Sequence, residues 1–110
     1  MYTYNAIVER VIDGDTMVIR VDVGFYITIK HVFRVHNFNA PETRKPAGLR
    51  ERKHGIEAKK QAVQLLEGKA VQVMTYKMAV YNRYEADIII DGADFASIMK
   101  DLGYTKKAKY

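Results

Sequence analysis

The chain has 110 residues, a length typical of one domain, and its 48% hydrophobic and 28% charged residues exclude an intrinsically disordered protein. The absence of cysteine excludes disulfide bonds, thiolate metal sites and cysteine nucleophiles. A formal net charge of +5 favours a polyanionic partner weakly, and no apolar run approaches the roughly 18 residues needed to cross a bilayer. We therefore expect residues 1–110 to form a single domain with no membrane partner.

The first forty residues are expected to form three strands. Residues 2–12 are rich in β-forming side chains and end at the turn dipeptide Asp13-Gly14. Residues 17–23 alternate between apolar and polar side chains, as in a half-buried strand. Residues 25–38 form a run long enough to require a bend or bulge, and one of its faces consists of Phe25, Ile27 and Ile29.

A loop and a helix are expected after the third strand. Asn39-Ala40-Pro41 breaks the strand pattern, and the charged residues 42–53 indicate an exposed loop. Residues 55–68 favour a helix that ends at Gly68. The apolar face of this helix is expected to consist of Ile56, Val63 and Leu66, with Ala62 beside them.

Two further strands and a second helix complete the pattern. Residues 70–78 alternate, and residues 83–90 form a β-rich run that ends at Asp91-Gly92. Residues 93–102 predict a short helix that packs through Phe95, Ile98, Met99 and Leu102. The order β-β-β-α-β-β-α predicts a mainly β fold with helices (α+β), a five-stranded OB-fold Greek-key barrel with two helices. An SH3-like barrel fits less well, because it does not normally carry so long a helix between its third and fourth strands.

Polar residues recur where the predicted strands end, and a closed barrel could bring them to one mouth. They are Asp13, Asp15, Arg34, Asn39, Glu42 and Arg83. Oxygen ligands can hold a hard cation such as Ca²⁺ or Mg²⁺, two guanidinium groups can bind a phosphate, and a further carboxylate can take a proton from water. Each residue also has a structural interpretation, because Asp-Gly-Asp is a common turn and the arginines could pair with nearby acids.

Basic residues are concentrated in two segments. Residues 44–60 contain seven lysines and arginines against two glutamates, and residues 100–109 contain four lysines against one aspartate. Such segments are either solvated faces or surfaces that attract nucleic acid, and charge alone does not separate these interpretations.

Several short motifs occur in one order along the chain. They are Val11-Ile12-Asp13-Gly14-Asp15-Thr16, Phe33-Arg34-Val35, Asn39-Ala40-Pro41-Glu42-Thr43, Gly55-Ile56-Glu57-Ala58, and Tyr81-Asn82-Arg83 followed by Asp91-Gly92. Together they resemble the staphylococcal nuclease (thermonuclease) family over about residues 6–103. The resemblance implies the same OB-type fold and a calcium-dependent endonuclease. Such an enzyme hydrolyses phosphodiester bonds of DNA and RNA with water activated by a general base, and leaves 3′-phosphate ends.

The resemblance also implies roles for individual residues. Asp15, Asn39 and the carbonyl oxygen of Ala40 correspond to the ligands of Ca²⁺, for which Mg²⁺ or another divalent cation could substitute, and Asp13 corresponds to an outer-sphere neighbour of the metal. Glu42 corresponds to the general base. The phosphate-binding arginines fall on Arg34 and Arg83, and Tyr81 and Lys109 are expected to contact substrate.

Departures from the family pattern leave a second hypothesis open. Asn39 stands where the family usually has Asp, so one ligand charge is lost and weaker metal binding is expected. Asn82 replaces a usual glycine, Val80 replaces a phosphate-binding lysine, and the family's third helix has no counterpart before Tyr110. The alternative is therefore a catalytically weakened or inactive OB module that binds nucleic acid or protein.

The expected partner is DNA or RNA, and the chain is expected to act as a monomer. No signal peptide is recognisable at the start of the sequence, which favours a cytoplasmic location unless a leader has been removed. A fragment of a larger protein is a further possibility.

Overall fold

The computed structural model describes residues 2–76 and 84–110. Its strands are β1 (Tyr2–Asp13), β2 (Thr16–Asp22), β3 (Thr28–Val35), β4 (Ala70–Thr75), β5 (Tyr84–Ile90) and β6 (Ala93–Asp94). The helices are α1 (Leu49–Leu66), between β3 and β4, and α2 (Phe95–Asp101), after β6. Neither helix combines the length and the apolar character that crossing a bilayer requires.

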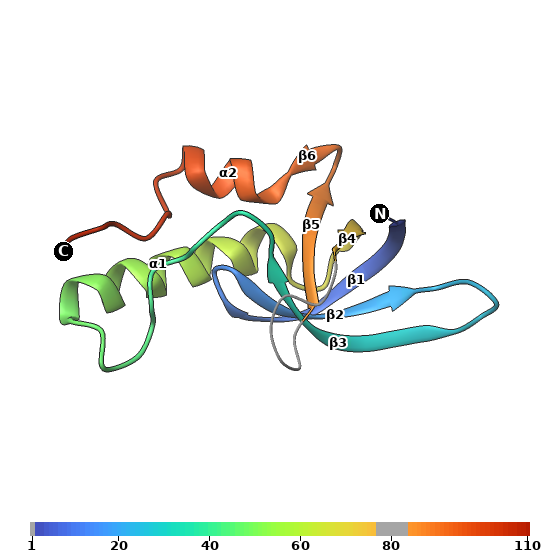
Figure 1. Ribbon diagram of the computed structural model, residues 1–110, viewed down its shortest axis with the longest axis horizontal. Helices are drawn as coiled ribbons and strands as arrows, with labels where there is room; N and C mark the ends of the chain where they lie inside the picture. Colours follow the sequence, from blue (N-terminus) through green and yellow to red (C-terminus); the bar gives the residue numbers. More distant parts are fainter. Residues whose placement is uncertain (1, 77–83) are drawn as a thin grey trace.

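The strands form a closed barrel (Figure 1). Antiparallel pairing gives the order β3-β2-β1-β4-β5-β6, and a parallel pairing between β3 and β5 closes the ring. This closing pair places Arg34 opposite Glu85 and Val35 opposite Ala86. The prediction of a five-stranded OB-like barrel with two helices is confirmed.

Alternating side chains fill the barrel, and small residues attach α1 to it. Met17, Ile19 and Val21 of β2 point inward and are buried, whereas Arg20 and Asp22 are exposed. The buried face of α1 consists of Gly55, Ala58, Ala62 and Leu66, which are spaced three or four residues apart. Burying a large aliphatic side chain stabilises a fold by about 1.5–3 kcal/mol. The small residues contribute mainly by allowing close approach of the helix.

This arrangement corrects two expectations about α1. The helix begins at Leu49, so the second half of the predicted 42–53 loop is helical. Ile56, which we expected in the core, is 46% exposed, whereas Val63 and Leu66 do face the barrel as expected. The face is rotated because Gly55 lies directly against Pro41 and Glu42, a contact that leaves no space for a larger side chain.

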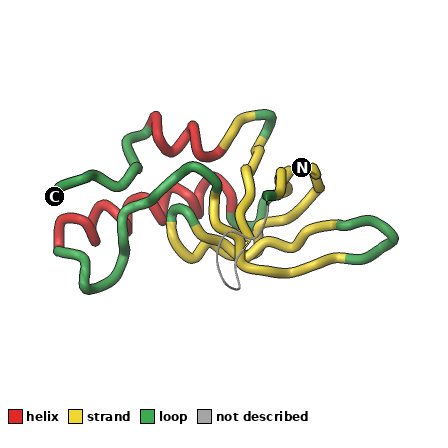
Figure 2. The backbone as a smooth tube through the Cα atoms, viewed as in Figure 1, coloured by secondary structure: helices red, strands yellow, loops and turns green. Residues whose placement is uncertain are grey.

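The β2–β3 hairpin corrects the expectation for residues 25–38. Phe25 and Tyr26 adopt positive φ angles of 54° and 58° in the turn between the strands, so β3 begins only at Thr28. Phe25, Ile27 and Ile29 are exposed. No register shift interrupts β2–β3, and the irregularities of the described sheet lie in β1, around Glu9 and Ile12. The hairpin projects away from both helices (Figure 2).

The C-terminal elements differ from expectation in detail. Ala93 and Asp94 pair with the end of β5 as β6, and α2 starts at Phe95 because the Asp94 carboxylate accepts the N–H of Ser97 and caps the helix. Phe95 and Met99 are buried as expected, but Leu102 follows the helix and is 52% exposed. The predicted strand ends at residues 77–78 and 83 lie outside the described residues.

Candidate active site

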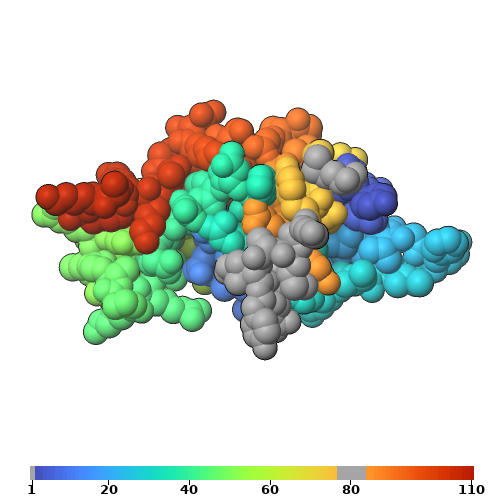
Figure 3. Space-filling model, viewed as in Figure 1, coloured from blue at the N-terminus to red at the C-terminus, as the bar shows by residue number. Residues whose placement is uncertain are grey.

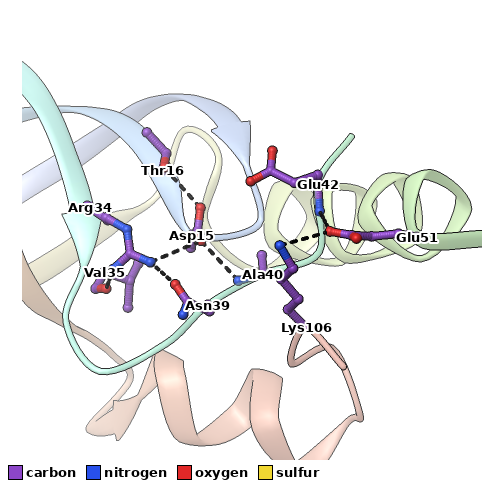
Figure 4. Close-up of polar contacts among 9 residues, drawn as sticks. All are labelled: Asp15, Thr16, Arg34, Val35, Asn39, Ala40, Glu42, Glu51 and Lys106. Atoms are coloured by element: carbon purple, nitrogen blue, oxygen red, sulfur yellow. Dashed lines mark hydrogen bonds and ion pairs between the residues drawn. The ribbon is translucent and has the colours of Figure 1, made fainter. Parts of the chain in front are cut away.

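The turn between β1 and β2 presents Asp15, whose carboxylate is held on several sides. One oxygen, Oδ2, accepts the N–H of Ala40 at 2.9 Å, and Oδ1 accepts the hydroxyl of Thr16 at 3.0 Å. The main-chain oxygen of Asp15 also accepts the N–H of Val35 at 2.9 Å. These bonds fix the carboxylate between the end of β3 and the segment that follows it (Figure 4).

Arg34 lies next to the C-terminal end of β3 and beside Asp15. Its Nη2 is 3.6 Å from Asp15 Oδ2 and donates to Oδ1 of Asn39, while Nη1 donates to the carbonyl of Val35 at 3.4 Å. The guanidinium side chain is 23% exposed, so it remains accessible to a ligand.

Glu42 follows the buried Pro41, and its main chain is fixed by a hydrogen bond. Its carboxylate has no hydrogen-bond or ion-pair partner among residues 2–76 and 84–110. The Glu42 N–H donates to Oε2 of Glu51 at 3.0 Å. This hydrogen bond, aided by Lys106, lowers the pKa of the Glu51 carboxyl from its ordinary value. Figure 4 shows the Glu42 carboxylate directed away from Glu51, and the residue is exposed. An exposed carboxylate on a fixed main chain is suited to accept a proton from a ligand or from water.

These groups enclose a polar cavity of about 330 Å³. Six residues that the sequence singled out line it, together with Thr16 and Lys106: Asp13, Asp15, Arg34, Asn39, Ala40 and Glu42. The carboxylate of Asp13 is oriented by the hydroxyl of Thr43, which donates to it at 2.9 Å.

Of the other expected site residues, the structure places only Lys109. Lys109 is exposed and does not line the cavity. Tyr81 and Arg83 lie outside the described residues, as do Val80 and Asn82. The sequence did not predict that Lys106 and Glu51 belong to the site. Lys106 is one of several lysines near the C-terminus, and Glu51 lies in a segment that was expected to be a loop.

In a comparison with models of protein families, residues 32–110 match the family described as "staphylococcal nuclease homologue". The chain belongs to the staphylococcal nuclease family. The match begins within β3 and includes Arg34, Asn39 and Glu42, whereas Asp13 and Asp15 precede it. A search of the curated proteins gives no match to the chain.

The cavity of this staphylococcal nuclease homologue offers oxygen donors of the kind that hard cations prefer. The lining residues include Asp13 and Asp15, which carry carboxylates, Asn39, which carries an amide oxygen, and Ala40, which has only its main-chain carbonyl to offer. No group of three or more His, Cys, Asp or Glu side chains within residues 2–76 and 84–110 is arranged to hold a metal alone. A Ca²⁺ site here would therefore need amide and main-chain oxygens in addition to the carboxylates, and Ca²⁺ accepts oxygen ligands of all three kinds.

Proposed function

We propose that this chain is a metal-dependent nuclease that hydrolyses phosphodiester bonds of DNA or RNA and leaves 3′-phosphate ends. The observation that carries the proposal is the shared cavity, which Arg34 and the exposed Glu42 line together with Asp15 and Asn39. Membership of the staphylococcal nuclease family supports it. We propose that residues 1–110 form one domain, because β1 and β2 belong to the same barrel as the matched region. We also propose that the chain acts as a monomer.

In the proposed reaction the chain's own residues bind the phosphate and move one proton. Arg34 binds the non-bridging oxygens of the scissile phosphate and stabilises the charge they develop. Glu42 accepts a proton from a water molecule as the water oxygen attacks phosphorus. The bond from phosphorus to the 5′ oxygen breaks, the 5′ oxygen leaves with the electron pair and takes a proton from solvent water, and the phosphate remains on the 3′ side. We assign Arg83 a second phosphate contact and Tyr81 and Lys109 contacts to substrate, by resemblance alone.

We assign the cofactor as Ca²⁺, the ion on which this family generally depends. Asp15, Asn39 and the Ala40 carbonyl would hold it, with Asp13 as an outer-sphere neighbour. When bound, the cation supplies positive charge that stabilises a pentavalent phosphate. The fit rests on the oxygen-only donor set of this chain.

The test is cleavage of a labelled single-stranded DNA by the purified chain in Ca²⁺ and in chelator. We expect cleavage only with the metal, and a loss of at least about 100-fold in Glu42→Gln, the size typical of removing a general base. Glu57→Gln is the matched control, because Glu57 is an exposed glutamate of α1 outside the cavity. Cleavage that survives in chelator, or in Glu42→Gln, would contradict the mechanism.

One observation favours a second candidate, a nucleic-acid-binding module without catalysis. Asn39 lacks the charge of the usual aspartate, and its amide oxygen already accepts a hydrogen bond from Arg34. If this pairing persists when nucleic acid binds, the cavity would bind phosphate without activating water. Salt-sensitive binding of DNA with no cleavage in Ca²⁺ would support this candidate.

A further inference from the structure

The tail that follows α2 lies along α1 and is held there by a histidine. The carbonyl of Gly103 can only accept, so His54 Nε2–H donates to it at 2.8 Å, and Nδ1 accepts the hydroxyl of Tyr110 at 2.7 Å. The same hydroxyl accepts the N–H of Lys107 at 3.1 Å. Both ends of the tail are thereby tied to one side chain of α1, and Figure 3 shows the tail lying against that helix.

This arrangement places Lys106 at the cavity. Its N–H donates to the main-chain oxygen of Asn39 at 2.8 Å, which joins the tail to the segment between β3 and α1. Its ammonium is 3.4 Å from Oε2 of Glu51, and the residue lines the cavity with Arg34 and Glu42. The lysine is therefore held by both its main chain and its side chain.

Glu51 connects Lys106 with Glu42 through a single oxygen atom. Oε2 accepts the Glu42 N–H at 3.0 Å and also faces the Lys106 ammonium. The Glu51 side chain is 13% exposed, whereas that of Lys106 is 44% exposed. Glu51 is therefore a fixed anchor, and the lysine keeps an open side from which it can reach a ligand.

The charges of the cavity favour such a role. Asp13, Asp15 and Glu42 place three carboxylates on its lining, and Arg34 is already engaged by Asp15 and Asn39. A phosphodiester adds a further negative charge, which a second cation would compensate.

We propose that Lys106 is a substrate-binding residue that contacts a phosphate of the nucleic acid, and that Glu51 positions it together with Glu42. This inference deepens the proposed nuclease function and rests on it. It makes the C-terminal tail a wall of the site, distinct from the walls formed by the β1–β2 turn and the segment after β3.

Binding in chelator tests Lys106 without requiring cleavage. We would measure fluorescence anisotropy of a labelled 12-nucleotide single strand with the full chain, Lys106→Met, Lys106→Arg and Lys100→Met, at several salt concentrations. Lys100 is the matched control, because it is an exposed lysine of α2 outside the cavity. Loss of one charged hydrogen bond in Lys106→Met should weaken binding about tenfold relative to Lys100→Met. It should also reduce the salt slope by about 0.7, the contribution of one phosphate contact to a single strand. Lys106→Arg should retain most of the affinity.

Equal binding by folded Lys106→Met and Lys100→Met would overturn the proposal, whatever the cleavage assay shows. Thermal unfolding identifies a variant that has lost its fold, and Lys106→Gln then replaces Lys106→Met in the same comparison. Absence of cleavage in the wild-type chain, with the Lys106 effect on binding intact, would contradict the nuclease function and leave the binding role standing.

Where cleavage is observed, kinetics separate the two roles. Lys106→Met should raise KM with little change in kcat, because its contact is made in the ground state as well as in the transition state. Glu51→Gln should raise KM and also lower kcat, because Glu51 contacts both Lys106 and the main chain of Glu42. A kcat unchanged in Glu51→Gln would contradict its positioning role.

Discussion

At the scale of single residues, Asn39 has the contact with the largest bearing on function. Its amide oxygen accepts a hydrogen bond from Arg34. The residue proposed as a metal ligand and the residue proposed to bind phosphate are therefore paired with each other in the described structure. Its main-chain oxygen meanwhile holds the tail through Lys106. Asn39 therefore joins β3 to the C-terminal tail, through its side chain on one side and its main chain on the other.

Asn39→Asp should lower the Ca²⁺ concentration that gives half-maximal cleavage. A full ligand charge replaces a dipole, and even at high effective dielectric this change is worth about 1 kcal/mol, or roughly fivefold in concentration. A calcium titration of activity measures the effect. Asn37→Asp is the control, because it adds the same charge at an exposed position outside the cavity. The same calcium requirement in both variants would show that Asn39 is not a ligand.

Gly55 illustrates an opposition between local propensity and close packing. A glycine inside a helix is about 1 kcal/mol less favourable than alanine, so propensity alone predicts that Gly55→Ala stabilises α1. An added Cβ would lie 2.7 Å from the carbonyl oxygen of Pro41 and closer still to that of Glu42. We expect the steric effect to dominate and the free energy of unfolding to fall by about 1–3 kcal/mol in urea denaturation. A more stable variant would refute the tight contact.

The residues that the sequence identified at the site came from motifs, whereas those it missed depend on packing. Seven of the eight residues that line the cavity lie in recognisable motifs, because these side chains are tied to turns and strand ends. Glu51 and Lys106 belong to no motif of that kind. They meet because α1 starts at Leu49 and because His54 holds the tail, and neither fact follows from local pattern.

At the scale of elements, alternation predicted the strands well and predicted the helix faces less well. A strand has only two faces, so the buried side of β2 follows directly from its sequence. In α1 the apolar residues are distributed around the helix, and small residues decide which side can approach the barrel. The break between the second and third strands was predicted, but the extent of the turn was missed because Phe25 and Tyr26 are uncommon residues for positive φ.

A hydrogen bond between Tyr76, which follows β4, and Asp87 of β5 leads to a prediction about stability at alkaline pH. The Tyr76 hydroxyl donates to Oδ2 of Asp87 at 2.6 Å, and this bond, with desolvation and the nearby negative charge, raises the pKa of Tyr76 above its ordinary value of 10.0. The folded state therefore holds the phenolic proton more tightly than the unfolded state. The stabilisation that this hydrogen bond gives the folded state is fully present below pH 10.0 and is lost as the pH rises through the higher pKa of Tyr76 in the folded state.

Tyr76→Phe should accordingly be less stable than the wild type at pH 8, and the difference should shrink above about pH 10. Urea unfolding of both proteins at pH 8, 9, 10 and 11 gives the comparison. A difference that stays constant to pH 11 would show that the hydrogen bond does not perturb the phenol.

At the scale of the whole molecule, two basic segments that are distant in sequence lie at one end. The tail lysines rest beside the first half of α1 and the loop before it, as the contacts of His54 and Glu51 require (Figures 1 and 3). The sequence gives both segments and the net charge of +5 but not their adjacency. Lys106 of the second segment also lines the polar cavity.

Binding of single-stranded DNA in chelator should therefore depend strongly on salt. Contacts to three or more phosphates would give a slope of log affinity against log salt of about −2 or steeper. Anisotropy titrations between 50 and 200 mM NaCl, concentrations chosen to span the range where counterion release is measurable, provide the slope. Affinity that does not change with salt would exclude this end of the molecule as a phosphate-binding surface.

The parallel pairing of β3 with β5 has a consequence for how the chain reaches its native state. The three N-terminal strands can associate early as a local meander, but the outer edges of β1 and β3 receive their partners β4 and β5 only after α1 has been made. Until then two unpaired edges are open to other chains. Ring closure links residues about fifty positions apart, as in Phe33 with Tyr84. Such distant pairing makes folding slow, so nascent and refolding chains will be most vulnerable to aggregation before the last strand docks.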